Sequence, residues 1–158
     1  DTALSDKPTA DYSALTTWAR LEDGRFILID ATRYRVSSAK LQSLIIRNAI
    51  AYSARFVCIE VANHAVDLIR MVGEHMPDGC TVRSVAIHGQ SKMQRLEAQL
   101  HKINTGKVFF IHDEPNLNLV SNELRQFPNG RHDDFVDSFS QALSQMGKGS
   151  GIPAWRIS

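Results

Sequence analysis

The chain has 158 residues, which favours a single domain, and its hydrophobic content of 43% and charged content of 22% exclude a disordered chain. No apolar run reaches the roughly eighteen residues that a membrane-spanning helix needs. Eighteen basic and seventeen acidic residues give a formal net charge of +1, so no global field indicates a nucleic-acid partner, although a local basic groove is compatible with this balance. Cys58 and Cys80 are isolated and lack metal-site spacing, which is typical of reduced cytosolic thiols.

Hydrophobic spacing divides the chain into strands and helices. In chain order we expect strands at 11–20 and 25–32, a helix at 39–54, a strand at 55–61, a helix at 63–75, a strand at 81–87, a helix at 91–103, a strand at 107–111, and helices at 118–127 and 131–146. Asp23-Gly24 predicts a hairpin turn between the first two strands, and Ser37-Ser38 can cap the first helix. This order predicts an α/β or α+β layered domain over 1–147, followed by a flexible tail at 148–158.

Glu60 stands out because it ends an apolar run at 55–61 that is typical of a strand buried on both faces. An ionised carboxylate in such a place costs several kcal/mol unless a partner compensates its charge. A lysine, an arginine or a divalent metal ion would satisfy Glu60. The alternative is a strand-end glutamate that lies in solvent or in a salt bridge.

Three carboxylates open the last predicted helix, in the stretch His132-Asp133-Asp134-Phe135-Val136-Asp137. Acidic residues in a first turn complement the helix dipole, so capping is their ordinary role. Three within five residues exceed what capping needs, and Asp137 lies one turn from both Asp133 and Asp134. The three carboxylates flank an apolar stripe at Phe135, Val136, Phe139, Leu143 and Met146. We therefore expect at least one of these carboxylate side chains to point along the sheet.

Asp1 is a third acidic position of interest, with Asp6 and Asp11 near it. Acidic residues at strand ends and at a helix start, converging on one edge of a sheet, form the oxygen-donor set that Mg²⁺ and Mn²⁺ prefer. Two such ions about 3.5–4 Å apart can activate water and stabilise the leaving oxygen in phosphodiester cleavage. The alternative is that these carboxylates are only helix caps and surface charge.

Five segments give the chain a likeness to a known family. They are Asp1-Thr2-Ala3 with Ala10-Asp11-Tyr12-Ser13-Ala14; Ile59-Glu60; Lys92-Met93-Gln94-Arg95; Gly106-Lys107-Val108; and Glu123-Leu124 through Phe127-Pro128 to 132–137. In this order they resemble the C-terminal nuclease domain of the large terminase subunit of tailed bacteriophages. The resemblance implies a ribonuclease H-like fold, in which helices flank a mixed sheet made of an antiparallel hairpin and parallel strands.

The resemblance implies a metal-dependent endonuclease that cuts concatemeric viral DNA during genome packaging, using two Mg²⁺ or Mn²⁺ ions. Asp1 matches the family's acidic residue after the first strand, and Glu60 matches the one that ends the fourth strand. For the third position the terminal helix leaves a choice. We favour Asp134 as a direct ligand and place Asp137 next, whereas helical geometry alone prefers Asp137 with Asp133.

Two further residues, Asp11 and His132, are candidates for the outer shell of such a site. The alternative for Asp11 is a hairpin position that faces solvent. Lys92, Arg95 and Lys107 are expected to line a groove along the DNA backbone, where each neutralised phosphate releases counterions. The alternative for these cations is a solvated helix face.

The resemblance also implies partners: double-stranded DNA, a terminase ATPase domain, the small terminase subunit and the portal protein, in the cytoplasm of the bacterial host and without a membrane. The sequence has no Gly-x-x-x-x-Gly-Lys-Ser/Thr loop, so we do not expect this chain to translocate DNA by itself. The family's first strand would have to precede Asp1. Two alternatives stay open: another ribonuclease H-like nuclease, such as a resolvase or an integrase-like enzyme, and a non-catalytic module that docks onto DNA or the portal.

Overall fold

The structure is a computed structural model that describes residues 12–61, 65–87, 89–111 and 115–147. Its elements are β1 (Ser13–Arg20), β2 (Phe26–Tyr34), α1 (Ser38–Ala51), β3 (Phe56–Glu60), α2 (Ala65–Gly73), β4 (Thr81–Val85), α3 (Lys92–Glu97), α4 (Leu100–Asn104), β5 (Val108–Phe110), α5 (Pro115–Gln126) and α6 (Asp134–Gly147). Asp1, Asp11 and the expected tail at 148–158 lie outside the described residues. In the part of the chain that the structure describes, no helix is long and apolar enough to cross a membrane.

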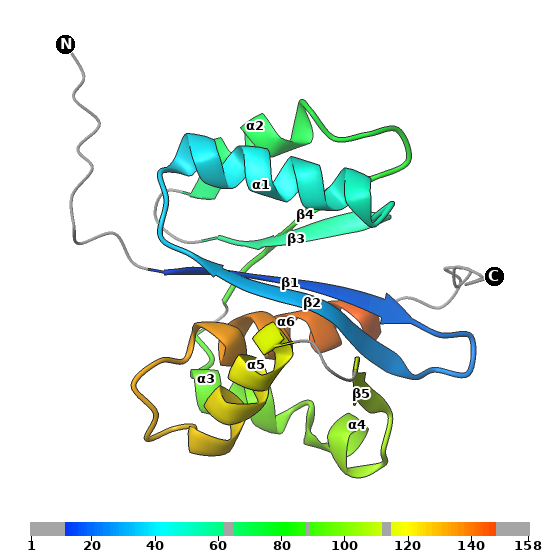
Figure 1. Cartoon of the computed structure of the whole chain (residues 1–158), viewed down its shortest axis with the longest axis vertical. Helices are drawn as coiled ribbons and strands as arrows, with labels where there is room; N and C mark the ends of the chain where they lie inside the picture. The colour runs from blue at the N-terminus through cyan, green and yellow to red at the C-terminus, as the bar shows by residue number, and fades with distance from the viewer. Residues whose placement is uncertain (1–11, 62–64, 88, 112–114, 148–158) are drawn as a thin grey trace.

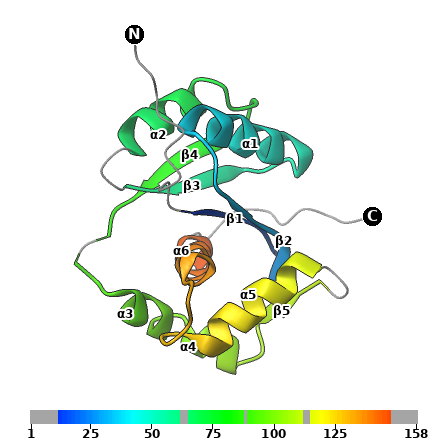
Figure 2. The same cartoon turned by 60° about the vertical axis from the view of Figure 1, so that its left-hand side comes forward.

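The strands of the described residues form two sheets. In the first, β1 pairs with β2 in an antiparallel hairpin and β5 pairs in parallel with β2, while the second consists of β3 and β4 in parallel. Helices α1 and α2 lie on one side of the strands, and α3 to α6 lie on the other (Figures 1 and 2). This arrangement confirms the expected combination of an antiparallel hairpin and parallel strands flanked by helices.

The turn predicted at Asp23-Gly24 connects β1 and β2. Gly24 has a φ of +83°, which a glycine adopts without steric cost. The Asp23 carboxylate accepts a hydrogen bond from the backbone N–H of Arg25 at 3.1 Å, which is the local bonding that makes aspartate common in turns. Ser37 caps α1 as expected, since its side chain accepts from the backbone N–H of Lys40.

Helix α6 is the centre of the core. Its whole predicted apolar stripe is buried: Phe135, Val136, Phe139, Leu143 and Met146. Phe139 meets Trp18 of β1 edge-on, with the ring centroids 5.2 Å apart. Figure 2 shows α6 almost end-on, with β1, β3 and β4 on one side of it and α3, α4 and α5 around the other. Because the stripe seats α6 against the hairpin, the acidic first turn of the helix is carried to the strands.

Two expected elements differ in the structure. β3 is half-buried along its whole length rather than buried on both faces, because it pairs with β4 along one edge and with no other described strand along its second edge. The helix expected at 91–103 is two short helices, α3 and α4, with a break at 98–99. At this break Gln99 is buried and its side-chain oxygen accepts a hydrogen bond from Lys102.

Candidate functional site

Glu60, at the carboxyl end of β3, shares a cation with the first turn of α6. Arg95 of α3 places its Nη1 3.6 Å from Glu60 Oε2, and its Nη2 donates a hydrogen bond to Asp137 Oδ1. The guanidinium is well shielded, with the Arg95 side chain only 16% exposed. Two carboxylates far apart in the sequence, one on a strand end and one on a helix, are thus held around one positive group.

Lys92 extends this group by one turn of α3. Its Nζ lies 2.8 Å from Asp133 Oδ1 and 2.8 Å from Asp137 Oδ2. The start of α3 is fixed by a capping box in which Ser91 and Gln94 satisfy each other's backbone N–H groups. We call Glu60, Asp133, Asp137, Lys92 and Arg95 the acidic cluster. Its three carboxylates outnumber its two cations, so one negative charge has no counter-charge within it.

The electrostatics of the acidic cluster favour additional positive charge. Burial raises the pKa of Glu60 above 4.5; Arg95 and Lys92 oppose this rise, and the neighbouring Asp137 adds to it. Burial lowers the pKa of Lys92, but the hydrogen bonds to Asp133 and Asp137 outweigh it, so that this pKa lies above 10.5. The ionised form of Glu60 is therefore compensated less than fully by the cations present.

This raised pKa predicts a pH-dependent difference between wild type and Glu60→Gln. A carboxyl group whose pKa is higher in the folded state than in the unfolded state stabilises the fold when protonated, and this contribution is lost as pH rises through the folded pKa. The stability of Glu60→Gln relative to wild type should thus increase as pH rises above 4.5, up to the raised pKa, and then level off. Urea unfolding midpoints in EDTA, taken from about pH 4 to pH 7, would measure this; a constant difference would contradict it.

Asp134 belongs to a different group of charges. Its Oδ2 lies 3.3 Å from Nε of Arg33 on β2, and Arg33 also forms an ion pair with Glu123 of α5. The Arg33 guanidinium lies over the ring of Phe135, 4.7 Å from its centroid. The structure therefore links Glu60, Asp133 and Asp137 through Lys92 and Arg95, and it pairs Asp134 with Arg33 instead.

The other expected site residues lie as follows. Lys92 and Arg95, expected along DNA, contact carboxylates of the acidic cluster. Lys107 is exposed immediately before β5. His132 meets the Tyr12 ring edge-on at 5.7 Å. Asp1 and Asp11 are outside the described residues.

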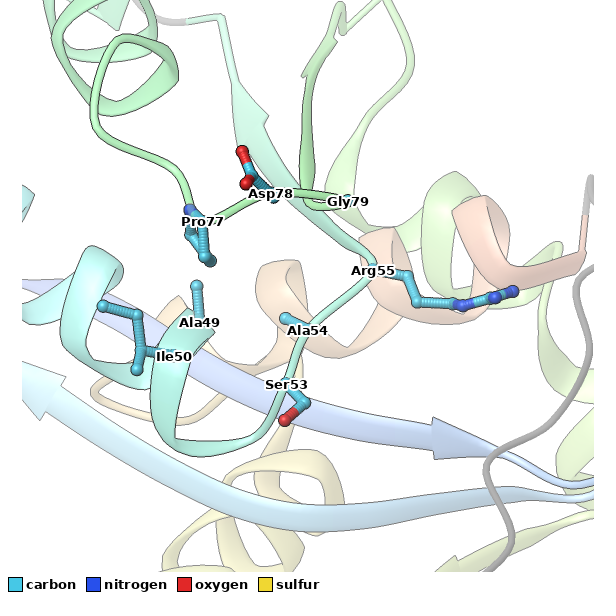
Figure 3. Close-up of a pocket in the computed structure, with 8 residues that line it drawn as sticks. All are labelled: Ala49, Ile50, Ser53, Ala54, Arg55, Pro77, Asp78 and Gly79. Carbon is cyan, nitrogen blue, oxygen red and sulfur yellow. The ribbon is translucent and has the colours of Figure 1, made fainter.

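A pocket of about 320 Å³ lies at the opposite end of β3 from Glu60. It is lined by Ala49, Ile50, Ser53, Ala54, Arg55, Pro77, Asp78 and Gly79 (Figure 3). Figure 3 shows the Arg55 side chain directed away from the other lining residues. The pocket contains no member of the acidic cluster, so it is separate from the carboxylates at the carboxyl end of β3.

The chemistry of the acidic cluster suits a hard divalent cation, because carboxylate oxygens are the ligands that Mg²⁺ and Mn²⁺ prefer. Within the ranges given above for the structure, no three histidine, cysteine or acidic side chains are grouped closely enough to hold a metal ion. Nε of Arg95 is buried there and finds no hydrogen-bond acceptor among the same residues. A further carboxylate in the acidic cluster would accept a hydrogen bond from this buried N–H group.

Comparison with protein families gives one finding. A family model described as the terminase RNaseH-like domain matches residues 1–146. Among curated proteins, none matches the chain. The matched range contains the whole acidic cluster, the Arg33 group and Asp1.

Proposed function

We propose that this chain, which belongs to the family of terminase RNaseH-like domains, is a metal-dependent endonuclease that cuts concatemeric viral DNA during genome packaging. Family membership supports a nuclease-type module of a terminase. The observation that most strongly supports catalysis in this chain is the sharing of Arg95 by Glu60 and Asp137, because it draws a strand-end and a helix carboxylate to one place.

Glu60 and Asp137 would hold the metal ions, with Asp133 beside them and with Asp1 as the carboxylate that the family pattern places after the first strand. When bound, two Mg²⁺ or Mn²⁺ ions would supply positive charge at the scissile phosphate and acidify an attacking water. Lys92 and Arg95 keep the carboxylates together in the metal-free protein. With metal ions held by the carboxylates, Lys92 and Arg95 would be available to contact the phosphates of the DNA backbone.

Double-stranded DNA is the substrate in this proposal, with Lys107 as a further backbone contact. The whole assembly would include a terminase ATPase domain, the small terminase subunit and the portal, in the cytoplasm of the bacterial host. Direct contacts to phosphates position a protein on DNA without reading its sequence, so we expect low sequence selectivity.

Cleavage of supercoiled plasmid tests the proposal directly. We expect nicked and linear products with Mn²⁺ or Mg²⁺ and none with EDTA. A folded chain that leaves the plasmid intact with both metals would overturn the endonuclease proposal. Cutting of four-way junctions in preference to linear duplex would instead assign the chain to a resolvase-like ribonuclease H-like nuclease.

A second candidate function is a non-catalytic module that docks onto DNA or the portal. The salt bridges of Lys92 and Arg95 favour it, since these cations already neutralise most of the charge of the carboxylates. Binding to DNA or to the portal, without cleavage under any metal condition, is the result that this function predicts.

Metal binding should also stabilise the fold. An ion that binds only the folded state adds about 2.7 kcal/mol at one hundred times its Kd, which corresponds to a rise in Tm of roughly 5–10 °C for a domain of this size. We expect a shift in this direction with Mn²⁺ relative to EDTA, and a clearly smaller one for Glu60→Gln. Equal melting temperatures with and without Mn²⁺ would indicate that the carboxylates serve only as caps and surface charge.

A further inference from the structure

A buried carboxylate on one helix caps another helix. Glu123 of α5 is only 7% exposed, and its Oε1 accepts hydrogen bonds from the backbone N–H of Phe135 at 2.6 Å and of Val136 at 3.3 Å. These amides belong to the first turn of α6, where backbone N–H groups have no acceptor within their own helix. Glu123 therefore takes the part that an N-cap residue of the same helix usually plays.

The second oxygen of Glu123 ties this cap to β2. Its Oε2 pairs with Arg33, which also lies 3.3 Å from Asp134 and covers the ring of Phe135. A buried carboxylate is costly when a partner is missing, and here both of its oxygens are bonded. Strand β2, helix α5 and the start of α6 are thus fixed to one another at Glu123.

Other charges hold the far end of α6. The carbonyl of Leu143 accepts from Nζ of Lys102 at 2.7 Å, and the carbonyl of Met146 accepts from Nη1 of Arg20 at 2.9 Å. An anion at the first turn and cations at the last turn both match the helix dipole. Leu143 lies six residues beyond Asp137, which is roughly 9 Å along the axis. Glu123 therefore fixes the first turn of α6, while Lys102 and Arg20 fix its last turn.

We propose that Glu123 is a positioning residue for the metal-binding carboxylates of α6, an inference that rests on the proposed nuclease function. By fixing the first turn, Glu123 sets the direction in which Asp137 points to Glu60, while Arg33 draws Asp134 aside. Asp137 itself lies on the turn that Glu123 caps, since its backbone N–H bonds to the carbonyl of Asp133.

The test compares Glu123→Ala and Glu123→Gln with Lys102→Met, which loosens the far end of α6. The quantity measured is the Mn²⁺ concentration that gives half-maximal plasmid cleavage. Loss of a residue that orients a metal ligand costs about 10–100-fold in metal affinity, so we expect such a rise for Glu123→Ala. Glu123→Gln keeps an oxygen for the amides and should fall between it and wild type. Lys102→Met should lower Tm and leave the midpoint within about twofold of wild type.

Equal midpoints for Glu123→Ala and wild type, or equal changes in Glu123→Ala and Lys102→Met, would overturn the positioning role. Where Glu123→Ala does not fold, Glu123→Gln decides in the same way. Amide hydrogen exchange provides a readout that needs no metal: Phe135 and Val136 should exchange faster in Glu123→Ala, and unchanged exchange would overturn the inference. If Phe135 and Val136 exchange faster in Glu123→Ala but the wild-type chain never cleaves plasmid, the nuclease proposal fails and the capping role of Glu123 stands.

Discussion

Glu60→Gln is expected to lower the rate of metal-dependent plasmid cleavage by about 100-fold or more while leaving the chain folded. The substitution preserves the size of the side chain and removes the charge that would hold a cation. Metal ions contribute several kcal/mol to stabilising the transition state of phosphodiester cleavage, and each 1.36 kcal/mol is worth about tenfold in rate. Single-turnover cleavage, with protein in saturating excess over plasmid and with saturating Mn²⁺, would measure the loss.

The fold should survive this change because Glu60 is not part of the core. Its side chain is 30% exposed, and Arg95 keeps its hydrogen bond to Asp137 when Glu60 is neutral. Glu97→Gln is the matched control, since Glu97 is an exposed glutamate on α3, the helix that contributes Arg95. If Glu60→Gln cleaves plasmid at the same rate as Glu97→Gln, Glu60 is not a metal ligand. An active nuclease would then lack the ligand that we propose at the end of β3.

The fold was largely predictable because its signals are local. The turn at Asp23-Gly24, the cap at Ser37 and the apolar stripe that begins at Phe135 each depend on residues within one element or one connection. The pairing of the sheets depends on distant residues. A strand that looked buried from its apolar run, Phe56–Glu60, is half-buried because its second edge meets no described strand.

The candidate site was less predictable because its contacts join residues far apart in the chain. Lys92 and Arg95 look like DNA contacts in the sequence, and only the packing of α3 near α6 shows that they contact Asp133 and Asp137. The buried cap was also missed. Its signal was available, since Glu123 continues the buried positions Leu117 and Val120 of α5 at helical spacing, which predicts a glutamate that faces the core.

The expectation from the sequence and the geometry of the structure favour different residues of α6 as the third metal-binding carboxylate. The motif leaves a choice, from which we favoured Asp134, whereas the structure places Asp137 with Glu60 around Arg95 and pairs Asp134 with Arg33. Both residues lie in the first turn of α6, so composition and spacing alone do not separate them. Their partners do, because Asp137 shares the Arg95 guanidinium with Glu60, whereas Asp134 shares Arg33 with Glu123.

Asp137→Asn should therefore reduce cleavage by about 100-fold or more, and Asp134→Asn by less than about tenfold. The Arg33–Asp134 pair is partly exposed, so its loss should cost at most about 1 kcal/mol of stability. Glu97→Gln is the control here too, because Glu97 is exposed on α3 and lies outside the acidic cluster. Cleavage lost in Asp134→Asn and kept in Asp137→Asn would make Asp134 the direct ligand, as we expected from the sequence. Helix α6 would then have to turn its first residue from Arg33 toward Glu60 when metal binds, and the Glu123 cap would be the contact that opposes this movement.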